Sequence, residues 1–272
     1  MKKDLSVIIL IAVFLVGLAL VLYPTVANTW NQRTQSKAIA VYETVLSDMT
    51  RADYDDLYLA AEEYNRSLSR LELPLVQYSK VAGYEDLLNV SGNGIMGYVT
   101  IEKIKVELPI YHGISDEVLN CAVGHLPGSS LPVGGIGSHA VLSAHRGLPS
   151  AKLFSDLDKL QVGDTFTVTT VDRLLTYEID QILIVRPSEI EALAADPGKD
   201  YCTLVTCTPY GINTHRLLVR GKRTENAIKK PAIYVSSNVY RIDPIIITPL
   251  VAAPMLLVLL IILLVRYRKG KR

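Results

Sequence analysis

The stretch YCTLVTCTPYGINTHRLLVRG, residues 201–221, predicts two β-strands joined by a short loop. Thr203–Thr206 is rich in β-branched residues, and Leu217–Val219 is an apolar run closed by an arginine and a glycine. Between the two runs, a proline, a glycine and an asparagine are typical of a turn. The stretch is therefore predicted to form an antiparallel hairpin.

The register of this hairpin follows if the strands pair symmetrically about the loop. Cys207 then faces Arg216, and Val205 faces Leu218 one step further from the turn. Residues directly opposite each other in an antiparallel pair lie on the same face of the sheet. A thiol and a guanidinium are thus expected to meet at the mouth of the hairpin. A nucleophilic cysteine also needs a proton carrier and donors for the developing oxyanion, and Arg216 is a candidate donor.

The proton carrier must come from the five histidines of the chain. HAVLSAHRGLP, which begins at His139, reads as a short strand that runs into a Gly/Pro loop at His145, where catalytic side chains commonly lie. His139 shares the strand parity of His145 but lies about 20 Å back along the strand, at roughly 3.3 Å per residue. His215 is expected on the face opposite Arg216, and His112 and His125 are expected in loops. His145 is the preferred candidate.

Three motifs together carry a family resemblance. GNGIMGYVTI, LSAHRGLPSAKLF and TLVTCTPYGINTHRLLVRG occur in this order within residues 87–223. In these motifs the chain resembles the sortases, and it is most similar to class C, the pilus-assembling cysteine transpeptidases of Gram-positive bacteria. Position by position, the resemblance implies that Cys207 is the nucleophile, His145 the acid and base, and Arg216 the residue that stabilises the oxyanion or positions the substrate.

The resemblance also implies the substrates. The acyl donor would be a surface protein with an LPXTG-type sorting motif, cleaved after its threonine through a thioester, and the acceptor would be a lysine amine of a pilin. A housekeeping sortase that anchors surface proteins to the cell wall and a non-catalytic membrane-tethered binding domain are the alternatives. A further rival is that this chain is itself a wall-sorted substrate, which needs a sorting motif just before a C-terminal apolar run. Residues 240–244, YRIDP, precede the apolar run Ile245–Val265 and are not such a motif. No cofactor and no metal are expected, because no zinc-ligand spacing or acidic cluster occurs.

One motif of class C is absent. Class C sortases usually carry an Asp-Pro-aromatic plug on a lid before the barrel, and residues 70–93 contain no such triplet. We therefore expect a site that is open or that is occluded by something else.

The three cysteines of the chain differ in their expected environments. Cys202 and Cys207 are an odd number of residues apart and should not bridge, because they point to opposite faces of a strand. Cys121 and Cys202 are expected to be buried, and a disulfide between these two is the alternative.

Short alternating segments from Ile95 onward predict a mainly β fold, a closed sortase-type β-barrel with short helices. Apolar residues spaced by three and four over residues 34–70 predict two amphipathic helices, with a break near 50–53. Within the barrel domain the predicted strands are 95–101, 104–111, 139–144, 165–171 and 174–185. The predicted helical turns are 115–122 and 188–195, a short helix is predicted over 153–160, and 124–137 is a predicted loop.

Two uncharged runs, Leu5–Leu22 and Ile245–Val265, each approach the roughly 20 residues that a helix needs to cross a bilayer. Both are flanked by basic residues on their outer side, which predicts cytoplasmic termini and an extracellular catalytic domain. A cleavable signal peptide is the alternative for the first run. Seven of the 28 Lys and Arg residues and one of the 27 acidic residues lie at the ends, so the middle is acidic, which argues against nucleic acid as a partner. The predicted domains are an N-terminal anchor (1–23), a helical segment and connector (24–93), the catalytic barrel (94–224), a linker (225–244), a C-terminal span (245–265) and a basic tail (266–272).

Overall fold

The computed structural model describes residues 2–225 together with 254, 258 and 261. The barrel and the helices that pack on it belong to one compact unit that begins at Gln32, while residues before Gln32 belong to a second unit. Each unit is described here by itself.

Two helices precede the barrel, as the periodicity predicts. Helix α1 spans Lys2–Ser47 and helix α2 spans Arg51–Ser69. The break between them is fixed by a capping box, in which Thr50 and Asp53 exchange side-chain to backbone hydrogen bonds. Among the described residues, one helical stretch, Ile11–Ser47, is long and apolar enough to cross a membrane by length and composition. The predicted span 245–265 lies outside the described residues, apart from three positions.

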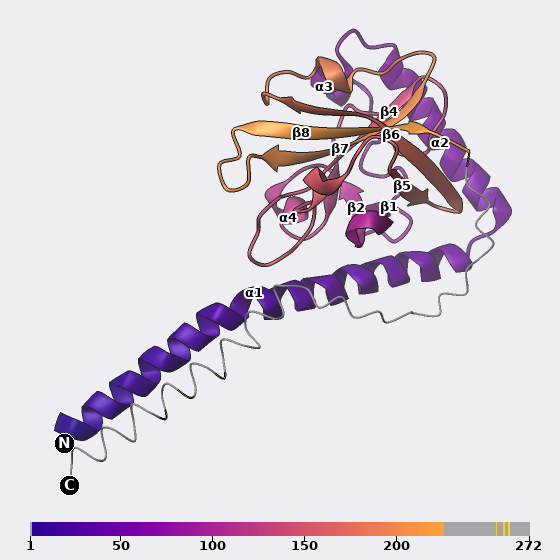
Figure 1. Ribbon diagram of the computed structural model, residues 1–272. Coiled ribbons are helices and arrows are strands. Elements are labelled where there is room, and N and C mark those ends of the chain that lie inside the picture. The colour runs from indigo at the N-terminus through magenta and orange to yellow at the C-terminus, as the bar shows by residue number, and fades with distance from the viewer. Residues whose placement is uncertain (1, 226–253, 255–257, 259–260, 262–272) are drawn as a thin grey trace. The chain divides into compact units, whose positions relative to one another are not determined.

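The described residues form eight strands that close into a barrel in the order β1-β2-β3-β4-β7-β8-β6-β5 (Figure 1). The neighbours β2 and β3, and also β4 and β7, run parallel, whereas the other pairs are antiparallel. The predicted closed β-barrel is thus confirmed. The strands are β1 (Ile95–Ile101), β2 (Val106–His112), β3 (Val123–His125), β4 (Ser138–Ser143), β5 (Thr165–Thr170), β6 (Arg173–Val185), β7 (Asp200–Thr208) and β8 (His215–Arg223).

The core fills the barrel and extends under the two helices. Tyr42 of α1 is fully buried, and its hydroxyl donates to the Met96 carbonyl (3.1 Å) and accepts from the Val171 amide (2.8 Å). Tyr58 of α2, which lies alongside the barrel in Figure 1, donates to the Thr170 carbonyl at 2.7 Å. Burial of the apolar helix faces, rather than helix propensity alone, holds α2 and the end of α1 on the barrel.

Several short elements differ from the sequence predictions. The predicted loop 124–137 begins inside strand β3, so His125 lies in a strand, and His112 ends strand β2. The predicted helix 153–160 is wrong, because only Leu157–Lys159 forms a single 3₁₀ turn. The turn α4 (Asp116–Leu119) with Ser115 as its N-cap, and a 3₁₀ turn at Glu191–Leu193, lie where helical turns were predicted. Three further short turns complete the described chain: α3 (Pro74–Gln77) and the 3₁₀ turns Tyr78–Lys80 and Glu102–Ile104.

Candidate active site

The β7–β8 hairpin has the register predicted from its sequence. Cys207 pairs with Arg216, and Val205 pairs with Leu218. Because paired residues lie on one face of the sheet, the thiol of Cys207 and the guanidinium of Arg216 project from the same face at the open end of the hairpin. Cys207 is partly exposed, as is Arg216.

Strand β4 brings His145 to the same place from the other side of β7. The two strands are parallel, with Ser143 opposite Val205. Beyond the end of β4, the Ala144 amide donates to the Val205 carbonyl (3.1 Å), and the Thr206 hydroxyl donates to the Ala144 carbonyl (2.8 Å). Carried two residues beyond the end of β4, this register would bring the backbone of His145 next to that of Cys207, since paired strands lie about 4.8 Å apart. His145 is partly exposed.

The face that bears these residues is the outer face of the barrel. Val141, Val205 and Leu218 form a small apolar cluster there, separate from the barrel core. Partly buried residues from the loop between β6 and β7, Ala192 and Leu193, pack against this cluster. On this outer face Cys207 is therefore partly exposed, while Val205, in the middle of the face, is buried.

The loops that carry the two ends also contact each other. Gly147, with φ +78°, lies against Tyr210, and a Cβ built on Gly147 would come within 3.0 Å of that ring. The guanidinium carbon of Arg146 lies 5.8 Å from the centroid of the same ring. On the other side, one guanidinium nitrogen of Arg216 donates to the carbonyls of Asn213 (3.2 Å) and His215 (3.1 Å), so Arg216 binds the end of its own loop.

The other histidines have structural partners instead of a thiol. His139 is buried, and its ring nitrogens contact the Thr203 hydroxyl (2.7 Å) and the Ala194 carbonyl (3.0 Å). His125 is buried next to Tyr84, and burial lowers its pKa to about 4. His112 contacts the carbonyls of Gly94 and Leu87. These three rings pair with backbone and hydroxyl groups, so His145, which follows the end of β4, stays the preferred candidate for the histidine that serves Cys207.

The cysteines divide as follows. Cys202 is fully buried in the core, as predicted, and burial raises the pKa of its thiol. Cys121 is exposed, so the expectation of burial is wrong for this residue, whose thiol donates to the Glu117 carbonyl instead. All three cysteines are free, so the alternative of a Cys121–Cys202 disulfide is also wrong.

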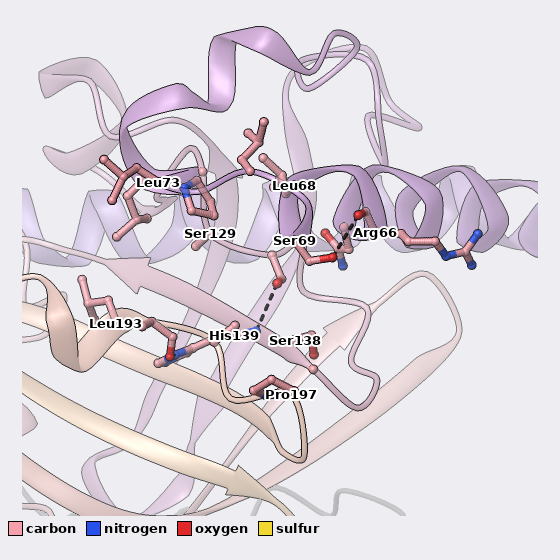
Figure 2. Close-up of a pocket in the computed structure, with 18 of the residues that line it drawn as sticks. Arg66, Leu68, Ser69, Leu73, Ser129, Ser138, His139, Leu193 and Pro197 are labelled. Atoms are coloured by element: carbon pink, nitrogen blue, oxygen red, sulfur yellow. Dashed lines mark hydrogen bonds between the residues drawn. The ribbon is translucent and has the colours of Figure 1, made fainter.

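A cavity of about 1070 Å³ lies at the other end of β4, beside His139. Figure 2 shows Ser69 and Leu73 on its helical side and His139, Ser138 and Pro197 on its barrel side. Residues 71–76 line this cavity, and Tyr84 packs on His112 and His125. Cys207, His145 and Arg216 do not line it, so the candidate chemistry lies outside the cavity. No group of His, Cys, Asp and Glu side chains suited to a metal occurs among the described residues.

Comparison with known proteins agrees with this geometry. The model of the Sortase domain family matches residues 99–224, which include Cys207, His145 and Arg216. The crystal structure of sortase C1 from Streptococcus agalactiae is 47% identical, with a TM-score of 0.65, over 70% of this chain and 100% of that one. The chain belongs to the sortase family. Sortases are cysteine transpeptidases, and the solved relatives place this sortase with class C.

Two further relatives show the breadth of the likeness. Sortase C-1 of Streptococcus pneumoniae is 42% identical with a TM-score of 0.63, over 70% of this chain and 100% of that one. Sortase A of Streptococcus agalactiae is 32% identical over 117 residues, which are 42% of this chain and 47% of the relative. The alignment thus spans about half the length of that curated relative.

Two residues near the site were missed by the sequence reasoning. Arg146 and Tyr210 join the loop after His145 to the loop after Cys207. Both stand inside the motif strings that carry the family resemblance, directly after His145 and three residues after Cys207. Their position in those strings was the available signal, but spacing alone does not show that the two loops touch.

Proposed function

We propose that this sortase is a membrane-anchored class C transpeptidase that cleaves an LPXTG-type sorting motif and transfers the acyl group to a lysine amine of a pilin. The observation that supports the proposal is the pairing of Cys207 with Arg216 across the hairpin, next to the parallel strand β4 that leads into His145. All three side chains are partly exposed, as an attack on a peptide substrate in the proposed reaction requires.

In the proposed mechanism the Cys207 thiolate attacks the carbonyl carbon of the threonine in the motif. Arg216 donates hydrogen bonds to the oxygen that becomes negative, which stabilises the tetrahedral intermediate. When that intermediate collapses, the C–N bond breaks, and protonated His145 gives its proton to the departing amine. The thioester that remains is then attacked by the acceptor amine, which loses its proton to the now neutral His145. The Cys207 thiolate leaves and the cycle closes.

The proposal of a pilin acceptor is supported by a similar sortase of known structure. Sortase C of Streptococcus pneumoniae, described for its pilin substrate specificity, is 39% identical with a TM-score of 0.61, over 70% of this chain. The proposed location, with both termini cytoplasmic and the barrel outside, is supported by one apolar helical stretch at Ile11–Ser47 and by the basic residues that flank the two apolar runs of the sequence. Catalytic roles for Cys207, His145 and Arg216 are part of the proposal.

The experiment uses the full chain in detergent with a fluorescent LPXTG peptide and two competing amines, a lysine-bearing pilin and a short glycine peptide that mimics a cell-wall acceptor. Mass spectrometry should find an acyl thioester on Cys207, and the product should be an isopeptide with the pilin lysine. A product with the glycine peptide would favour a housekeeping enzyme, and no thioester with either amine would favour a non-catalytic binding domain. Fast labelling of Cys207 by a small thiol reagent in the same sample is expected if no plug covers the thiol.

A further inference from the structure

Arg146, the residue after His145, is a buried cation outside the proposed catalytic three. Its side chain is only 9% exposed. Burying a guanidinium is costly unless its donors are paired. A buried arginine next to the proposed acid and base therefore needs a structural reason.

The contacts of Arg146 pair its two terminal nitrogens, while its buried Nε has no hydrogen-bond partner among the described residues. One terminal nitrogen forms an ion pair with Asp158, in the 3₁₀ turn Leu157–Lys159. The other terminal nitrogen donates to the hydroxyl of Thr208 at 3.4 Å. Thr208 directly follows Cys207, and the guanidinium also lies by the ring of Tyr210. Arg146 thus joins the loop of His145, the 157–159 turn and the end of the strand that carries Cys207.

This arrangement bears on the position of the loop that carries His145 relative to the segment that follows Cys207. β4 ends at Ser143, so His145 lies beyond the last regular ladder pair and is held by few backbone bonds, among them the Phe154 amide on the His145 carbonyl (3.2 Å). Proton transfer to a leaving amine needs the ring within hydrogen-bond reach of that nitrogen. A displacement of about 1 Å in a catalytic group can cost about 10²-fold in rate.

We propose that Arg146 is a positioning residue, which holds His145 at the distance from Cys207 that protonation of the leaving amine requires. The proposal rests on the proposed roles of His145 and Cys207. Arg146 does not touch the scissile bond in this account, so its loss affects the step that depends on His145 and leaves peptide binding unchanged.

The test compares two substrates with one sequence, an LPXTG peptide and its depsipeptide, in which the scissile N–H is replaced by oxygen. The ester has a better leaving group and depends less on an acid. In the full chain without acceptor amine, Arg146→Ala should lower the single-turnover rate of leaving-group release from the amide about 10²-fold with peptide affinity within about twofold, and from the ester by less than about fivefold. His145→Ala is the reference and should show the same amide-selective loss.

Two further variants secure the result. Asp158→Asn, at a side chain that is 48% exposed, removes the negative charge that pairs with Arg146 without touching the interior and should give an amide-selective loss of about three- to tenfold. Arg66→Ala, in an exposed ion pair with Glu63 on α2, is the matched control and should change neither substrate.

The possible failures are distinct. Equal losses for amide and ester in Arg146→Ala, or no loss in a folded Asp158→Asn protein, would overturn the positioning role. If Arg146→Ala does not fold, by circular dichroism, the Asp158 variant decides alone. If His145→Ala itself loses amide and ester activity equally, the proposed acid role of His145 fails, whichever way the Arg146 variants behave.

Discussion

Each face of strand β7 carries a cysteine, and the two cysteines lie in opposite environments. Cys202 points into the barrel, is fully buried among core residues, and has a thiol whose pKa is raised by burial. Cys207, five residues on, points outward, is partly exposed and pairs with Arg216. An odd separation along a strand sends two identical residues to opposite faces.

The difference separates positions that contribute to the packed core from the position at which the proposed chemistry takes place. Inward positions are held by packing on all sides, so their side chains have no freedom and no access. The outward position Cys207 at the end of β7 is partly exposed, and beyond it the loops after β4 and β7 contact each other through Gly147 and Tyr210. Thiolate chemistry needs exposure and charged partners, and burial in an apolar core opposes the thiolate. The predictions below test this division.

The largest expected effect comes from exchanging the two cysteines for alanine. Cys207→Ala should lower transpeptidation by at least about 10³-fold, because removal of a nucleophile leaves only binding and oxyanion stabilisation. Cys202→Ala should keep activity within about twofold and should cost about 1–2 kcal/mol in the free energy of unfolding through the void left in the core. Product formation by mass spectrometry and urea unfolding measure the two effects. Loss of activity in the Cys202 variant with its fold intact would contradict the division.

The second prediction compares two arginines of strand β8. Arg216→Ala should lower kcat about 10²- to 10³-fold, as expected when a donor to an oxyanion is removed. Arg220 is the matched control, because its guanidinium is bound to Asp180 and lies over the ring of Tyr201, away from Cys207. Arg220→Ala should leave kcat within about twofold. Equal losses in both variants, measured on the same LPXTG peptide, would show that Arg216 serves the strand and has no special role in the reaction.

The third prediction extends the comparison to histidine. His125 is buried in β3, and burial lowers its pKa to about 4, whereas an unfolded chain has a histidine pKa near 6.5. Between these values the unfolded state takes up a proton that the folded state does not, so stability falls as the pH drops from about 6.5 to about 4. The full effect is about 3 kcal/mol. Urea unfolding at pH 7 and pH 4.5 should show a smaller difference for His125→Gln than for the wild type. An equal pH dependence would contradict a buried neutral ring, because the other titrating groups are common to both proteins.

Much of the fold could be predicted because the relevant signals are long or repeated. The hairpin register follows from strand parity on either side of a short loop, and the break between α1 and α2 follows from Thr50 as a cap. The strand predicted over 139–144 is β4, whose end leads directly into His145. In each case local chemistry and tertiary packing favour the same arrangement.

The wrong predictions fall on two kinds of segment. In one, buried residues have the spacing of a helix without forming one, and in the other the element is too short to show a periodic pattern. Four buried side chains have helix-like spacing: Leu153, Phe154, Leu157 and Leu160. They are buried by separate turns instead of one helix, and Leu153 has a φ of +39°. Strand β3 has three residues, which is too few for an alternation to be visible. The contacts of Arg146 join residues that are far apart in sequence, and spacing does not report such contacts.

The smallest expected effect concerns the loop contact on the outer side. Gly147→Ala adds a methyl group 3.0 Å from the Tyr210 ring at a positive φ, and should lower kcat a few-fold and the free energy of unfolding by about 1 kcal/mol. Gly163→Ala has a comparable φ of +91° with nothing within 4 Å, so it should show the strain without the loss of kcat. Because Tyr210 is exposed, Tyr210→Ala combined with Gly147→Ala should recover the kcat of Tyr210→Ala alone while the strain remains. Additive losses of kcat in the double variant would mean that the methyl group acts on something other than the Tyr210 ring, and the loop contact would then not govern the outer site.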